Sequence, residues 1–168
     1  MMRALLLAAL VATLGASAPP ATVTLSGQFV RGASIGLADL AAMPRTQVTA
    51  SEHDGSTSHY AGVTLAALLR QAGAPVGDAA KGLAARSYLT VTGSDGYVAA
   101  YSLSELDTTA ASCAPILADT REGAPLPAAS GPFRVVAPCD RVQARWVRNV
   151  VALTVGTLPG PPIKPMKD

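Results

Sequence analysis

The chain has 168 residues, a mass of 16.9 kDa, 14% charged residues and a formal net charge of +2. This length accommodates one domain with a hydrophobic core and excludes two domains of ordinary size. The small net charge provides no long-range field to steer nucleic acid, so the composition argues against a nucleic-acid partner. Hydrophobic residues make up 49% of the chain, but they are mostly scattered alanines interrupted by Gly and Pro. This pattern favours a small globular domain over a membrane protein.

The first 18 residues have the features of a secretory signal peptide. Arg3 precedes an apolar run over residues 4–14, and Ala16-Ser17-Ala18 is a small-residue cleavage signature. The run is shorter than the roughly 20 apolar residues that a spanning helix needs. We therefore expect residues 1–18 to direct export. Pro19 directly follows the expected cut and disfavours cleavage there, which leaves a shifted site or an uncleaved anchor as alternatives.

Short strands and helices alternate in the first part of the expected domain. Residues 22–25 alternate polar and apolar side chains, and residues 47–50 form a second strand candidate. Between them, residues 37–43 are typical of a short helix that ends at Pro44. The run 51–59 is polar throughout, so we expect a loop there.

A helix over residues 65–72 is the most strongly indicated element. Thr64 is a favourable N-cap, and Gly73 supplies a left-handed C-terminal end. Four apolar residues recur on one face at the i, i+3, i+4 and i+7 positions: Leu65, Leu68, Leu69 and Ala72. This periodicity predicts a helix that packs one side against the core.

An antiparallel hairpin and a short helix follow. Residues 88–92 and 97–101 are typical strands, and the turn 93–96 joins them. Ser102 and Glu105 have the spacing of a capping box, which predicts a short helix after the second strand.

Three more strands are expected, at residues 115–118, 133–137 and 149–155. The tail over residues 156–168 is rich in Pro and has little to bury, so we expect it to be disordered. Short strands mixed with short helices, in no strict βαβ order, predict an α+β domain over residues 22–155.

The motifs of several enzyme classes are absent from the sequence. No glycine-rich phosphate loop opens a helix, which argues against dinucleotide-binding and P-loop folds. No Gly-x-Ser-x-Gly elbow supports a serine hydrolase. The chain has two cysteines, and an oxidising compartment favours a structural disulfide between Cys113 and Cys139 over two free thiols.

Five short motifs carry a resemblance to a known family. They are Tyr60-x-Gly-Val-x-Leu-x-x-Leu-Leu69, Asp95-Gly-Tyr97, Gly123-x-Pro-Leu126, Gly131-Pro-x-Arg-x-Val-x-Pro138 and Arg145-Trp-Val147. In this order, over about residues 22–155, the chain resembles the molybdopterin-binding domain of the sulfite oxidase family. The resemblance implies an α+β fold of mixed and antiparallel strands with short helices, which holds a molybdenum cofactor through its pterin and phosphate.

One departure from the family pattern concerns the metal. The resemblance implies that a cysteine thiolate ligates molybdenum and that it lies within residues 48–58, where this chain has no cysteine. Cys113 and Cys139 are not in register with that ligand. The resemblance therefore implies a pterin cofactor, either a reduced pterin or molybdopterin, and makes molybdenum doubtful.

Small exported relatives without the thiolate suggest a role. The resemblance extends to some of these relatives, which bind a free reduced pterin as a signal-sensing module and often work with a membrane-bound cyclic-dinucleotide enzyme. By resemblance, the leading hypothesis is a non-catalytic periplasmic pterin-binding protein that senses its ligand for a membrane signalling partner. The alternatives are a molybdenum cofactor-dependent oxidoreductase and a structural interaction protein.

The cluster of Arg134, Arg145, Trp146 and Arg148 provides the main candidate pterin contacts. Arg134 lies on an apolar strand, where a buried guanidinium needs a carboxylate, a phosphate or a pterin edge as partner. Arg145 and Arg148 flank Trp146, and guanidinium beside indole offers stacking and hydrogen bonding to a flat heterocycle. The alternatives are an ion pair for Arg134 and a core anchor for Trp146.

Three further residues are candidate pterin contacts. Asp95 can accept two hydrogen bonds from an aminopyrimidine edge, with Tyr97 beside it, although the Asp-Gly pair also has an ordinary role in a hairpin turn. His53 is the nearest replacement for the missing thiolate, or a pterin contact. It shares its segment with three other candidate ligands: Glu52, Asp54 and His59. Their spacing matches no zinc motif, so a solvated loop is the alternative. We assign no catalytic residue and no metal ligand.

Overall fold

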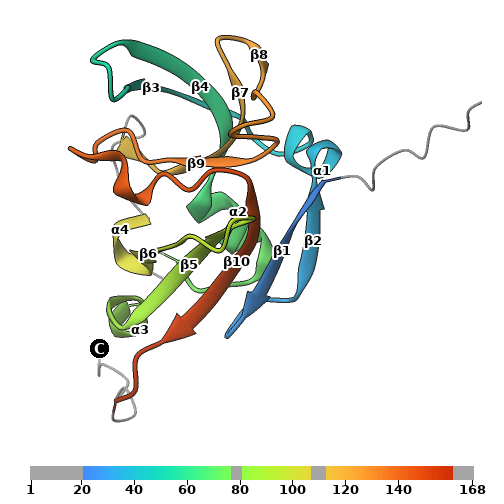
Figure 1. The fold of residues 1–168 in the computed structure, drawn as a ribbon. Helices are drawn as coiled ribbons and strands as arrows, with labels where there is room; N and C mark the ends of the chain where they lie inside the picture. Colours follow the sequence, from blue (N-terminus) through green and yellow to red (C-terminus); the bar gives the residue numbers. More distant parts are fainter. Residues whose placement is uncertain (1–20, 77–80, 107–112, 161–168) are drawn as a thin grey trace, which may run out of the picture.

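The computed structural model describes residues 21–76, 81–106 and 113–160, which fold into two sheets with short helices (Figure 1). The first sheet has the spatial order β2 (Ala33–Gly36), β1 (Thr22–Gly27), β10 (Val150–Thr157), β5 (Ser87–Gly93) and β6 (Val98–Ser102). The second has the order β3 (Thr46–Ser51), β4 (Thr57–Thr64), β7 (Ile116–Arg121) and β8 (Ala124–Pro125), and β9 (Arg134–Val136) also pairs with β7.

The helices are short and lie beside or between the sheets. They are α1 (Leu37–Ala41), α2 (Leu65–Ala72), α3 (Lys81–Ala85), α4 (Leu103–Leu106) and the 3-10 helix η3 (Gln143–Arg145). β1 pairs in parallel with β10, and the other strand pairs are antiparallel. Strands thus dominate, and the α+β description holds only loosely. Within the described residues, no helix is both long and apolar enough to cross a lipid bilayer.

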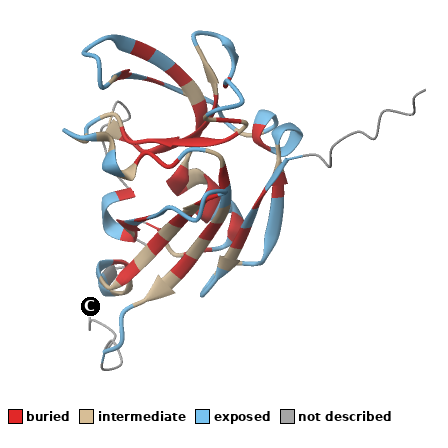
Figure 2. Ribbon diagram, in the orientation of Figure 1, coloured by how far each residue is buried: buried red, intermediate tan, exposed pale blue. Residues whose placement is uncertain are grey.

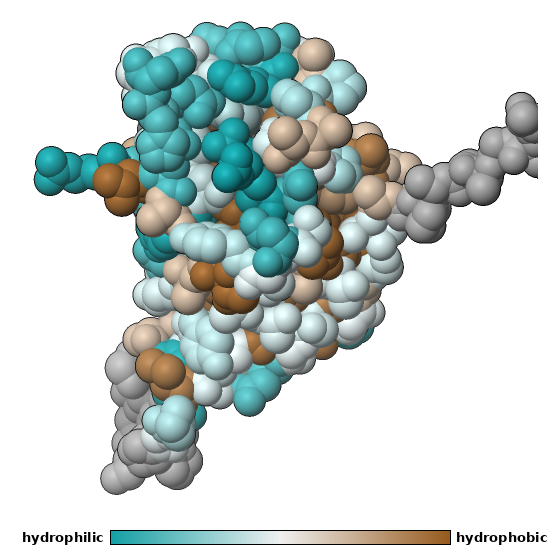
Figure 3. Space-filling view, viewed as in Figure 1, coloured by the Kyte–Doolittle hydropathy of each residue, from teal (hydrophilic) through white to brown (hydrophobic). Residues whose placement is uncertain are grey.

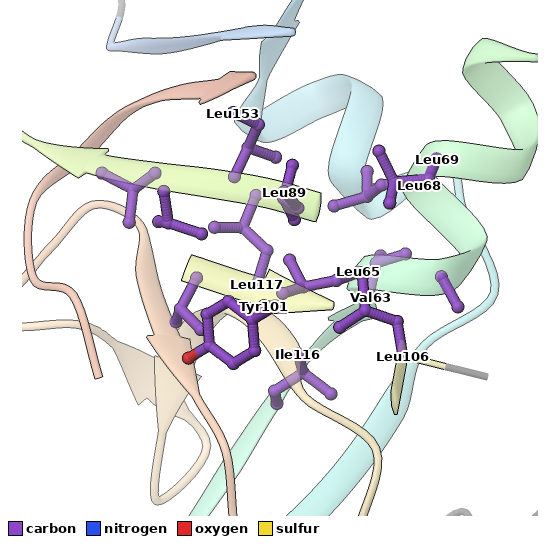
Figure 4. Close-up of a cluster of buried hydrophobic side chains, with 14 of the residues drawn as sticks. Val63, Leu65, Leu68, Leu69, Leu89, Tyr101, Leu106, Ile116, Leu117 and Leu153 are labelled. Carbon is purple, nitrogen blue, oxygen red and sulfur yellow. The ribbon is translucent and has the colours of Figure 1, made fainter. Parts of the chain in front are cut away.

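The hydrophobic core lies between the two sheets and includes α2. Burial alternates along β5, as expected for a strand with one face on the core (Figure 2). Leu89 and Leu153 from the first sheet meet Leu117 from the second, and Leu65 and Leu69 of α2 fill the space beside them (Figure 4). Removing these side chains from water is the main favourable contribution to folding.

The best-indicated elements of the sequence are confirmed. The Thr64 hydroxyl accepts a hydrogen bond from Ala67 N at 3.1 Å, and Gly73 adopts a left-handed conformation with φ 95° at the end of α2. The antiparallel pairing of β5 with β6 is also as expected. Ser102 directly precedes α4, and its backbone N–H donates to the Glu105 carboxylate at 2.7 Å, which confirms the predicted capping interaction.

The expected loop over residues 51–59 was wrong in part. The segment is the end of β3, a turn and the start of β4, so the polar run forms the tip of a β-hairpin. Ser58 is buried there because its hydroxyl accepts two hydrogen bonds from Arg121, at 2.7 and 3.0 Å. A buried strand position held by hydrogen bonds carries no hydrophobic signal, so the apolar pattern could not reveal it.

The two ends of the expected domain differ in what the structure describes. β10 continues through Gly156 to Thr157, so the expected tail begins at least two residues too early. Residues 161–168 and the expected signal peptide at 1–18 lie outside the described residues. Cys113 and Cys139 form a disulfide that joins the chain before β7 to the chain after β9.

Gly62 explains part of the Tyr-x-Gly-Val motif. The β4–β7 ladder shifts register between Ala61 and Gly62. A Cβ atom at Gly62 would lie 2.1 Å from Leu117 O, so the two backbones approach too closely for any side chain. The glycine thus lets β4 pack closely against β7 near Tyr60, which lies two residues earlier on the same strand.

Candidate functional site

A polar cavity of about 380 Å³ lies between the β3–β4 hairpin, the segment after β8 and the segment around η3. Its lining includes four basic side chains and one acid: Arg121, Arg134, Arg148, His53 and Glu52. The other lining residues are Pro127, Ala129, Ser130, Gln143 and Trp146. Hydrophilic side chains gather over the second sheet and extend towards the first on the face shown in Figure 3. The excess of basic groups suits an anionic or acceptor-rich ligand.

Arg134 is the most unusual residue of this cavity. It lies on β9 and is only 8% exposed, yet it forms no ion pair within 4.0 Å among the described residues. Its Nη1 donates to Tyr60 Oη at 2.8 Å, and its Nη2 lies 3.5 Å from Gln143 Oε1. Its Nε is buried without a hydrogen-bond partner in the described structure. A buried unpaired donor is costly, so this guanidinium has capacity left for a ligand.

Two aromatic rings hold the Arg134 guanidinium. Its Cζ lies 5.4 Å from the Tyr60 ring centroid and 5.3 Å from that of Trp146. The two rings meet edge to face, with centroids 6.3 Å apart. Trp146 is 6% exposed and donates from Nε1 to Ala137 O at 2.9 Å. Trp146 is therefore both a core anchor and part of the cavity wall.

Glu52 provides the negative charge of the cavity. It accepts hydrogen bonds from the Tyr60 hydroxyl and, at 3.2 Å, from Gln143 Nε2, while Arg121 Nη2 lies 3.5 Å away. Burial opposes its ionisation, but these hydrogen bonds and the charges of Arg134 and Arg121 outweigh burial and lower the pKa of Glu52. Burial of the Tyr60 phenol, together with its hydrogen bond to Glu52, raises the pKa of Tyr60 to about 12. An ionised carboxylate and a neutral phenol therefore coexist at neutral pH.

The structure brings together four of the seven residues proposed from sequence. Arg134, Trp146, Arg148 and His53 all line the cavity, and they come from distant parts of the chain. Arg148 and His53 are exposed. No hydrogen bond or ion pair of Arg148 with another described residue is present, so its guanidinium is available to solvent or ligand.

Arg145 lies outside this cavity. Its guanidinium donates to both oxygens of Asp140, at 2.6 and 2.9 Å, and to Glu105 at 2.9 Å. It also lies 4.5 Å from the ring centroid of Tyr101. The hydrogen bonds that Arg145 donates to Asp140 raise the pKa of Arg145, and burial raises the pKa of Tyr101. These contacts use the guanidinium to hold η3 against β6 and α4.

Asp95 and Tyr97 also lie outside the cavity lining. The Asp95 carboxylate accepts from Tyr97 N at 2.9 Å, which is the turn chemistry given above as the alternative. The Tyr97 hydroxyl donates to Ala144 O at 2.6 Å, so it connects the hairpin to η3. Tyr97 therefore supports the segment that carries Trp146, and Asp95 stabilises the turn that carries Tyr97.

Sequence reasoning missed three residues of the site and gave a fourth another role. Arg121, Gln143 and Tyr60 were not proposed as site residues, and Glu52 was considered only as a metal ligand. Arg121 is the last residue of β7 and Arg134 is the first residue of β9. Each arginine therefore lies at the end of a strand with buried apolar residues, and this position was a usable signal. Gln143 had no local signal, because its partners Ser51 and Glu52 lie more than 90 positions away.

The residues present fit a pterin better than they fit the family's metal ligation. An unpaired arginine donor, a carboxylate and a tryptophan match a flat, polar heterocycle. The sequence has two cysteines and the disulfide uses both, so no thiol is free to ligate molybdenum. The described residues contain no group of three His, Cys, Asp or Glu side chains arranged to hold a metal ion.

Comparison with known proteins supports the fold. The sulfane dehydrogenase SoxCD from Paracoccus pantotrophus superposes with a TM-score of 0.63 over 80% of this chain, at 21% sequence identity. This chain spans 38% of the SoxCD chain, well under half of its length. No curated protein matches the sequence significantly.

The family described as "Oxidoreductase molybdopterin binding domain" matches residues 17–161. This match and the SoxCD superposition confirm the resemblance to the sulfite oxidase-like domain. They also support the expected sulfite-oxidase-like fold, in a form dominated by strands. Because the match covers most of its length, the chain belongs to the oxidoreductase molybdopterin-binding domain family.

Proposed function

We propose that this protein binds a pterin in the cavity around Arg134 and acts as a ligand sensor without performing molybdenum redox chemistry. The observation that carries the proposal is a buried arginine with an unpaired donor beside a tryptophan, in a chain whose two cysteines are both in a disulfide. The family supplies the class of ligand, and the missing thiol argues against the family's metal chemistry.

The residues proposed as ligand contacts have distinct parts in this proposal. Arg134 donates hydrogen bonds to the ligand and is held in place by Tyr60 and Gln143. Trp146 offers an aromatic surface beside the guanidinium. Arg148 and His53, both exposed, reach the outer part of the ligand. A molybdenum cofactor, when bound to such a domain, supplies two-electron redox chemistry at the metal, whereas these residues supply only binding and orientation.

Fluorescence of Trp146 provides a direct test. It is the only tryptophan in the chain and lines the cavity, so a bound pterin changes its emission. We expect tetrahydropterin, added anaerobically to the purified protein, to bind with a micromolar or lower dissociation constant. Arg134→Ala should weaken binding by roughly 10- to 100-fold, the range for a hydrogen bond to a charged group.

A matched control uses an arginine far from the cavity. Arg31 is exposed and lines a separate apolar recess beside α2, so Arg31→Ala should bind tetrahydropterin as the wild type does. Absence of micromolar binding to the wild type would exclude the proposal. Equal affinity of the wild type and Arg134→Ala would remove Arg134 from the site.

A molybdenum cofactor-dependent oxidoreductase is the second candidate function, because family membership fits it equally well. Elemental analysis separates the two. Protein exported from a host with molybdenum cofactor biosynthesis should contain far less than one molybdenum atom per chain if our proposal is correct. Stoichiometric molybdenum, retained after gel filtration, would favour the enzyme.

The location and the partner are parts of the same proposal. The leader-like residues 1–18 support export to the periplasm, where the sensor would meet a membrane-bound signalling protein. Cell fractionation tests the location. Crosslinking in intact cells, with and without added pterin, tests for a membrane partner whose contact depends on the ligand.

A further inference from the structure

Among the described residues that line the cavity, one side chain is acidic: Glu52, at the start of the β3–β4 turn. Hydrogen bonds from Glu52 N to Ser56 O and from Gly55 N to Glu52 O fix the backbone of this turn. The side chain is 13% exposed, so it is largely withdrawn from water but still reaches the cavity. The backbone and the partners of the side chain therefore hold the carboxylate in one place.

Both oxygens of Glu52 retain capacity to accept hydrogen bonds. Oε1 accepts one from the Tyr60 hydroxyl, and Oε2 accepts one from Gln143 Nε2. A carboxylate oxygen has two lone pairs, so each oxygen keeps one acceptor position. Two acceptors side by side match two parallel N–H donors, as in a carboxylate paired with a guanidinium.

A cationic donor stands next to this acceptor pair. Arg121 Nη2 lies 3.5 Å from Glu52 Oε1, and its guanidinium carbon lies 5.8 Å from the Tyr60 ring centroid. The edge of a pterin presents a 2-amino group, the N3–H and a 4-oxo group in a row, that is, two donors and then an acceptor. The carboxylate followed by a guanidinium is the complementary set.

We infer that Glu52 determines specificity for the 2-amino-4-oxo edge of the ligand, so the site selects pterins over lumazines, which carry a 2-oxo group. The inference rests on the proposed pterin-binding function and replaces the role expected above for Asp95. Asp95 does not line the cavity and uses an oxygen on Tyr97 N. A 2-oxo group would face the carboxylate oxygen acceptor to acceptor, which leaves both groups unpaired in a partly dry site.

The experiment compares two ligands that differ at one position. Binding of 6,7-dimethyltetrahydropterin and of the matching tetrahydrolumazine is measured anaerobically from Trp146 fluorescence. We expect the wild type to prefer the pterin by roughly 10- to 100-fold. In Glu52→Gln the preference should fall to within about 3-fold, because an amide can turn either its N–H or its C=O towards position 2. Glu122→Gln, which neutralises an exposed acid outside the cavity, should keep the full preference.

The ratio of the two affinities separates recognition from a structural role. If Glu52 only neutralised Arg121 and Arg134, Glu52→Gln would change both affinities together and keep the ratio. An unchanged ratio, or a wild type that binds both compounds equally, overturns the inference and leaves the proposed pterin-binding function intact. Failure of the wild type to bind either compound overturns both. If the variant does not fold, the wild type still tests the inference, because equal affinity for the two compounds overturns it.

Discussion

Three arginines close together in sequence have different roles because their surroundings differ. Arg134 is buried among aromatic rings with an unpaired Nε, whereas Arg145 is neutralised by Asp140 and Glu105. Arg148 is exposed at the cavity and forms no ion pair with any carboxylate of the described residues. Only a guanidinium with unused donors can contribute to ligand binding, so Arg134 and Arg148 are the candidates and Arg145 is structural.

Replacement of Arg145 tests this separation of roles. Arg145→Ala removes two hydrogen bonds to Asp140 and one to Glu105 from a partly exposed site, and we expect a loss of about 1–2 kcal/mol in the free energy of unfolding. Urea denaturation measures this loss. Tetrahydropterin affinity should change by less than about 2-fold, well below the effect expected for Arg134→Ala. A large loss of affinity with unchanged stability would instead place Arg145 at the ligand.

At the scale of elements, much of the site is carried by segments that connect the strands. The turn of the β3–β4 hairpin carries Glu52 and His53, and the chain from β9 to β10 carries Gln143 and Trp146. Backbone bonds hold the second segment, including Val135 N to Val147 O at 2.9 Å. The Cys113–Cys139 disulfide adds a covalent link at its start.

Removal of this disulfide measures its contribution. The two cysteines are 26 positions apart, and in the chain-entropy model closing a loop of that size stabilises the folded state by about 3 kcal/mol. We expect the Cys113→Ala/Cys139→Ala variant to lose roughly this much free energy of unfolding in guanidinium titrations without reductant. Dithiothreitol should destabilise the wild type and leave the double variant unchanged. Equal stability of the two proteins would show that packing of β9 on β7 alone holds the segment.

At the scale of the whole molecule, the positive charge of the chain is concentrated at the cavity. The formal net charge is +2 for all 168 residues with histidine neutral, and the three arginines and one glutamate among the described lining residues alone give the same formal charge. Burial opposes the ionisation of Glu52, but its hydrogen bonds and the charges of Arg134 and Arg121 outweigh burial and lower its pKa. This coupling makes the stability of the fold depend on pH.

The sign of that dependence follows from linkage. The folded-state pKa of Glu52 lies below its ordinary value of 4.5, so its contribution to stability is present above pH 4.5 and is lost as the pH falls through the folded-state pKa. We expect the difference in unfolding free energy between the wild type and Glu52→Gln to be constant from about pH 6 to 8 and to shrink below about pH 4.5. Urea denaturation across this range measures it, with Glu122→Gln as control. A difference that grows in acid would contradict the lowered pKa.

Local signals in the sequence were sufficient for several parts of the fold. The helix α2 was indicated by its cap and its apolar periodicity, and the β5–β6 hairpin by its Asp-Gly turn. The β3–β4 hairpin was not predicted from the sequence. Its buried Ser58 and Tyr60 are held by hydrogen bonds to charged side chains, namely Arg121, Arg134 and Glu52. Hydrophobic periodicity detects the burial of apolar groups. It does not detect buried polar groups whose hydrogen-bond partners lie on distant strands.

The sequence by itself determined the family, through five motifs that lie in order along the chain, and it also indicated the disulfide and the lack of a free thiol. Only the tertiary structure decided which of the arginines faces the cavity and that Glu52, not Asp95, supplies the carboxylate there. The reason is physical. Turns, caps and periodic faces are set by neighbours in the chain, whereas the partners of a charged side chain are set by approach through space, here between a hairpin and a segment more than 90 residues apart.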